Sequence, residues 1–255
     1  MVRKIWFINA IACAVVCTGL QAVTPTEPDP SNLEFQKKFL KRQVSQTMSV
    51  GRAIRSIASH YPQDIVSIVD VALTTYPDHY QEIIHAAISA QPAATEEIVQ
   101  LAIRRNVSSC PNIVELAINA EPTYVDFVVQ AAANATPEEL DDIVRVAVLT
   151  EPDSADSIVQ TLSLKHPNKI VEIMTTALNA VPYVGEYVVE ALLAVFPAQK
   201  DELIRTAINN TLSEKEQQLR ILHAAQNAGV EESVIRQYAS NAGISVEEVN
   251  VALAE

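Results

Sequence analysis

The segment PEELDDIVRVAVLTE, residues 137–151, is followed directly by PDSADSIVQTLSLKH, residues 152–166. Both begin with proline, and both place Ile-Val at their seventh and eighth positions. Outward from this pair a proline recurs every fifteen residues, with one gap that Val107 fills in phase. An internal repeat of this kind decides the architecture. Its prolines are Pro62, Pro77, Pro92, Pro122, Pro137, Pro152, Pro167, Pro182 and Pro197.

The apolar residues of each fifteen-residue unit follow a helical period. Counted from the proline as position one, they fall at positions four, seven, eight, eleven and twelve, which is the stripe of an amphipathic helix. Position seven is Ile, Val or Leu throughout, and position eleven is alanine in eight of the ten units. Position nine is mostly polar and follows two adjacent apolar positions, which a half-buried strand would not tolerate. Each unit is therefore predicted to be one helix.

The regular prolines exclude one long supercoiled rod. Each proline inside a continuous helix would cost about 3 kcal/mol. We therefore expect about ten short helices over residues 62–211, with antiparallel neighbours stacked in two layers as an all-α solenoid. This architecture resembles HEAT and tetratricopeptide stacks in general form, although the fifteen-residue unit is shorter than either. Position two of several units carries a good capping residue, such as Asp78, Thr123 or Asp153, so we expect the helices to begin there.

The two ends of the repeat region differ from it in composition. Residues 33–61 carry six basic residues and only Glu34 as an acid, which predicts a basic N-terminal helical cap. After Thr211 the fifteen-residue register fades, and we expect a C-terminal helical cap over residues 212–255. Gly229 and Gly243 each follow Asn-Ala, as at helix ends, and the segment from Ser245 to Glu248 is a capping box.

The first residues have the composition of an export signal. Arg3 and Lys4 precede a mostly apolar run from Ile5 to Leu20, so residues 1–22 are predicted to be a signal peptide cleaved after Ala22. An uncleaved anchor, or a lipoprotein attached through Cys13 or Cys17, are the alternatives. The proline-rich residues 23–32 are expected to form an extended linker. The protein is thus expected in the periplasm or outside the cell, with an outer-membrane lipoprotein as the lesser alternative.

The sequence contains no recognisable catalytic or metal-binding motif. Nucleotide-binding glycine loops, nucleophile elbows and paired cysteine ligands are all missing from it, so we expect no cofactor, no metal and no enzymatic activity. The formal net charge of −13 argues against nucleic acid as a partner.

Two groups of residues are candidates for binding. Tyr124, Phe127, Tyr183 and Tyr187 lie outside the apolar stripe, in the fifth and ninth units, so they should share one layer. They either pack between units or form a partner surface. The basic residues Lys37, Lys38, Lys41 and Arg42 either make the polar face of the cap or contact anionic lipid weakly.

These features favour one function and leave two alternatives. The first is an exported, non-catalytic scaffold that binds an unknown protein or envelope polymer. The second is an accessory protein of the membrane surface that uses the basic N-terminal segment. The third is a carbohydrate-active enzyme on a helical toroid, which would need a cleft with paired carboxylates.

Overall fold

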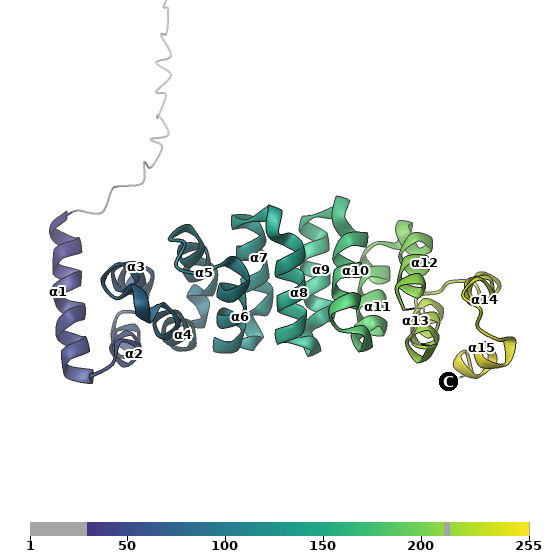
Figure 1. Cartoon of the computed structure of the whole chain (residues 1–255), viewed down its shortest axis with the longest axis horizontal. Coiled ribbons are helices and arrows are strands. Elements are labelled where there is room, and N and C mark those ends of the chain that lie inside the picture. The colour runs from purple at the N-terminus through teal and green to yellow at the C-terminus, as the bar shows by residue number, and fades with distance from the viewer. Residues whose placement is uncertain (1–29, 212–214, 255) are drawn as a thin grey trace, which may run out of the picture.

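The structure is a computed structural model that describes residues 30–211 and 215–254. In this part of the chain it contains fifteen α-helices, nine 3₁₀ turns and no strand, so the predicted all-α solenoid is confirmed (Figure 1). The signal peptide and most of the linker lie outside the described residues. The helices are α1 Pro30–Thr47, α2 Val50–His60, α3 Ile65–Thr75, α4 Tyr80–Ala90, α5 Thr95–Arg104, α6 Cys110–Ala120, α7 Val125–Ala135, α8 Leu140–Thr150, α9 Ala155–Lys165, α10 Ile170–Ala180, α11 Gly185–Val195, α12 Lys200–Asn210, α13 Lys215–Asn227, α14 Glu232–Asn241 and α15 Val246–Ala252.

The proline of each unit opens a 3₁₀ turn, and the α-helix follows at position four. In the first unit Pro62–Asp64 form this turn and α3 begins at Ile65. The last residue of that unit, Tyr76, donates its N–H to the carbonyl of Ala72 at 2.8 Å and accepts from the N–H of His79 at 3.0 Å. Its φ of −133° and ψ of 61° leave the helical region, as expected before a proline. This linkage recurs at the other proline-marked junctions.

The expectation that position two caps the helices is wrong. No side chain caps the α-helix in any of the proline-marked units, because the 3₁₀ turn places position two one turn ahead of the helix. The last N–H of each turn instead bonds to a backbone carbonyl of the junction, as His79 does to Tyr76. A backbone carbonyl therefore accepts from an N–H group ahead of the α-helix, where a side-chain cap was expected.

The helices alternate between two layers. Most helices pack more extensively on a helix two places along the chain, such as α7 on α9 and α8 on α10, than on their sequence neighbours, whereas the end helices α1 and α14 pack most on α2 and α13. The even layer contains α2, α4, α6, α8, α10 and α12, and the odd layer contains α1, α3, α5, α7, α9, α11 and α13. Figure 1 shows an elongated stack in which α7 to α11 stand upright while α3 and α4 are seen nearly end-on, so the helix axes turn along the molecule.

The apolar stripe forms one continuous core between the layers. Positions seven, eight and eleven are buried in all ten units, and position eleven is alanine except at Leu162 and Leu192. Since these residues belong to one buried cluster shared by the helices, a short helix gains its stability from its neighbours rather than from its own propensity.

The junction that lacks a proline has a different geometry. Helix α5 ends one residue early, at Arg104, and Asn106 adopts a φ of 50°. The N–H of Val107 reaches back to the carbonyl of Ala102 at 3.4 Å, and that of Asn106 to Ile103 at 2.9 Å. These two bonds form a Schellman motif, so asparagine here supplies the left-handed residue that ends the helix.

The ends continue the two layers. Helix α2, in the segment expected as a basic cap, has the length of a repeat helix and packs on α4, while α1 packs on α2 and α3. At the other end α13 packs on α11, and α15 follows in the same layer. Gly229 and Gly243 both have a φ of 76°, and Ser245 and Glu248 form a capping box, as expected. Helix α1 already begins at Pro30, within the expected linker.

Candidate functional site

The four aromatic residues predicted as a partner surface lie in the odd layer, on α7 and α11 and the turns before them. Phe127 is 49% exposed, Tyr183 55% and Tyr187 57%, whereas Tyr124 is half-buried. The rings of Tyr124 and Phe127 lie 5.4 Å apart at 34°, so they form one aromatic pair. The structure therefore places the four residues in two groups within one layer, with α9 between their helices.

A hollow of about 200 Å³ lies beside the second aromatic group. Tyr183 and Tyr187 line it from the α11 unit, and Asp153 and Asp156 line it from the α9 unit. Both carboxylates are exposed, and neither forms an ion pair or hydrogen bond with another described side chain. The hollow thus combines two tyrosine rings with two carboxylates that face solvent.

The preceding pair of helices in the same layer, α7 and α9, has hydroxyl donors that the hollow lacks. There Asp126 of α7, equivalent to Asp156, accepts hydrogen bonds from Ser157 at 2.6 Å and Thr161 at 3.2 Å, both on α9. In the next unit thirty residues on, Tyr187 replaces the serine and Ala191 replaces the threonine. The local hydroxyl donors are lost, so Asp156 is left beside a large ring. A comparison of units two apart could have found this difference in the sequence.

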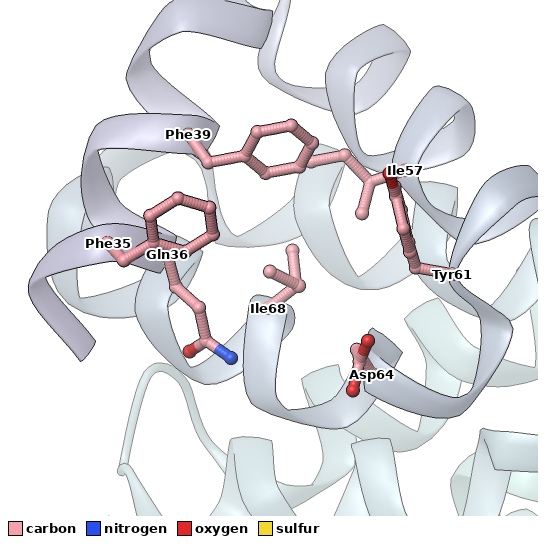
Figure 2. Close-up of a pocket in the computed structure, with 7 residues that line it drawn as sticks. All are labelled: Phe35, Gln36, Phe39, Ile57, Tyr61, Asp64 and Ile68. Carbon is pink, nitrogen blue, oxygen red and sulfur yellow. The ribbon is translucent and has the colours of Figure 1, made fainter. Parts of the chain in front are cut away.

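Sequence reasoning missed a second depression, at the N-terminal end (Figure 2). It is an open groove of about 330 Å³ between α1, α2 and α3, with a mainly aromatic and aliphatic lining. The ring of Phe39 lies 6.4 Å from that of Phe35 in a stacked arrangement and 6.0 Å from that of Tyr61 in an edge-on arrangement. The other residues that line the groove are Gln36, Ile57, Asp64 and Ile68.

The basic residues predicted as a membrane contact lie on α1. Lys38, Lys41 and Arg42 are exposed, while Lys37 is half-buried. None of the four is within ion-pair distance of a carboxylate in the described part of the chain.

Residues that could hold a metal or perform covalent chemistry do not converge. Within residues 30–211 and 215–254 no group of three or more His, Cys, Asp or Glu side chains could hold a metal ion. Cys110 is buried and accepts a hydrogen bond from Thr136 at 3.2 Å, and burial raises the pKa of its thiol. A buried thiol with a raised pKa is mostly protonated at neutral pH, as is usual for a cysteine that packs in a core.

A polar cluster around Glu82 links two helices of the even layer. Glu82 on α4 accepts from the hydroxyl of Ser49 and from the N–H of Gly51 at 2.9 Å, and these bonds to Ser49 and Gly51 help to lower the pKa of the carboxyl. The bonds join the start of α2 to α4 within the even layer.

Among the described helices none combines the length and apolar composition that a membrane crossing requires.

Comparison with known proteins gives no relative. No family model, curated protein or solved structure matches the chain.

Proposed function

We propose that the protein is an exported, non-catalytic scaffold whose odd layer binds a cationic segment of a protein or polymer of the cell envelope. The hollow between α9 and α11 is the observation that supports this most directly. Tyrosine faces attract cations, and the carboxylates of Asp153 and Asp156 add charge-assisted hydrogen bonds to a lysine or arginine.

The arrangement of the stack supports an extended partner. The Tyr124–Phe127 pair and the tyrosine hollow belong to units five and nine of the same layer, so a partner segment that crosses α9 contacts both. Exposed aromatic side chains commonly supply most of the binding energy of an interface. The export signal predicted for residues 1–22 gives the expected location of this partner.

A double substitution tests the hollow without removing a core residue. Tyr187→Ser with Ala191→Thr reproduces the serine and threonine that satisfy Asp126 one step earlier, so the variant should fold with unchanged stability. We expect it to bind a fluorescein-labelled lysine- and arginine-rich peptide at least about tenfold more weakly, by fluorescence polarisation.

The matched control is Leu164→Ser, which alters an exposed residue near the other end of α9. It should leave the affinity unchanged, and a peptide with glutamate in place of the basic residues should not bind. Equal affinity of the double variant and the unsubstituted chain, or equal binding of the acidic peptide, would contradict the proposal.

A further inference from the structure

The N-terminal end of the stack has the opposite charge to the rest of the molecule. Residues 33–61 contain six basic residues and one acid, whereas residues 62–211 contain seven basic and twenty-one acidic residues. None of the six basic side chains forms an ion pair with a described residue. The six are Lys37, Lys38, Lys41, Arg42, Arg52 and Arg55. An uncompensated positive field is thus confined to one end of an acidic rod.

The outer face of α1 brings cations and an aromatic side chain together. Leu40 is fully buried and marks the inner face of the helix. Phe35, Lys38 and Arg42 are spaced three and four residues apart on the opposite face, and all three are exposed. Because α1 is the first described helix of the odd layer, no described helix covers this face (Figure 1).

The aromatic side chain on this face is unusually accessible. Phe35 is 68% exposed and lies at the edge of the groove, on the far side from Asp64 (Figure 2). Met48, at the other end of α1, is 85% exposed. Large apolar side chains beside lysine and arginine are characteristic of helices that lie in the interface of a membrane.

We propose that this end of the stack docks on an anionic phospholipid bilayer. Lys38, Lys41 and Arg42 contact the phosphates, and Phe35 inserts among the acyl chains nearest the surface. The acidic remainder is repelled by the same surface, so the rod projects away from the membrane and keeps the tyrosine hollow accessible. This contact is independent of the odd-layer hollow and goes beyond the scaffold function.

Charge complementarity disfavours end-to-end docking of α1 on the C-terminal helices of a second copy. The three basic residues of the C-terminal helices each pair with a nearby glutamate, as Lys215 does with Glu248. Five glutamates are present in residues 215–254, so only Glu231 and Glu247 lack such a pair there, too few to balance six cations. A layer of phosphates supplies many negative charges to an exposed helix face.

Vesicle co-sedimentation of residues 23–255, which retain every described helix, tests this inference. The chain should sediment with phosphatidylcholine vesicles that contain phosphatidylglycerol and not with phosphatidylcholine alone. Each basic residue near such a surface contributes about fivefold to binding at moderate salt. Lys38→Glu with Arg42→Glu should therefore weaken binding more than about tenfold, and high salt should have a similar effect on the unsubstituted chain.

The matched control is Lys165→Glu with Arg205→Glu, two exposed residues of the body without an ion pair, which gives the same change in net charge. It should bind vesicles nearly as well as the unsubstituted chain. Phe35→Ala should weaken binding by a factor that salt does not change.

Equal loss in both double variants, binding without phosphatidylglycerol, or no binding at low salt would overturn the proposal. Sedimentation equilibrium that shows self-association through Lys38 and Arg42 would also overturn it, in favour of a second copy. The α1 variants should bind the lysine- and arginine-rich peptide with unchanged affinity. A failure of the membrane proposal can therefore be distinguished from a failure of the proposed odd-layer hollow.

Discussion

Ser163 is a buried exception to the apolar pattern. It occupies position twelve of its unit, is fully buried, and its hydroxyl has no hydrogen-bond partner within the described structure. A buried hydroxyl without a partner has lost its hydration without compensation. Ser163→Ala removes this group with little change in volume, so we expect the free energy of unfolding to rise by about 1 kcal/mol in urea denaturation. A decrease would show that the hydroxyl has a partner after all.

Glu82 makes the contact between α2 and α4 depend on pH. Hydrogen bonds from Ser49 and Gly51 lower the pKa of this carboxyl below its ordinary value of 4.5. A lowered folded-state pKa stabilises the protein above the unfolded-state value, and this stabilisation is lost as pH falls through the folded-state value. Glu82→Gln should therefore unfold more easily than the unsubstituted chain at pH 7, by about 0.5 kcal/mol for a partly exposed group. The difference should disappear under acidic conditions below the lowered pKa, and a difference that grows with acidity would refute this assignment.

At the scale of the single helix, the junction at Val107 keeps the fifteen-residue spacing of the repeat but has a different backbone geometry from the proline-marked junctions. Val107 keeps the fifteen-residue phase, but its N–H bonds to Ala102 and the preceding Asn106 has a φ of 50°. Val107→Pro would make the sequence more regular, yet it removes this N–H and disfavours the conformation of Asn106. We expect a loss of about 1–3 kcal/mol in thermal or urea unfolding.

Asn106→Gly is the control for that substitution, because glycine adopts the same backbone conformation without strain. It should leave stability unchanged or slightly higher. If Val107→Pro proves stabilising, the Schellman motif does not form in solution.

The sequence predicted the helices better than it predicted their ends. Two adjacent apolar positions followed by a polar one identified each helix, because burial against two neighbours fixes that pattern. The capping prediction failed because a side chain such as Asp78 can cap a helix only where the helix starts, and backbone bonding in the 3₁₀ turn moved that start to Tyr80. The groove beside Phe35 was also missed, since it depends on how three helices cross rather than on a spacing along the chain.

At the scale of the whole molecule, the structural unit is a pair of helices. Deletion of residues 137–166 removes α8 and α9 with their turns and leaves every remaining helix in its own layer. We expect this variant to unfold cooperatively, with about 2–4 kcal/mol less stability. Deletion of residues 152–166 alone moves each later helix into the opposite layer, so its unfolding, followed by circular dichroism, should be broad and early. Similar behaviour of the two variants would contradict a two-layer stack.

The contact between α7 and α9 tests this arrangement most directly. Asp126 and Ser157 are thirty-one residues apart, and their side chains are within 2.6 Å across the odd layer. In the Cys110→Ala background, without residues 1–22, Asp126→Cys with Ser157→Cys should form a disulfide on mild oxidation, whereas Asp141→Cys with Ser157→Cys should not. In an unbroken helix the first pair would lie about 46 Å apart and could not react. A cross-link in the second pair and none in the first would show that the helices are not stacked in alternating layers.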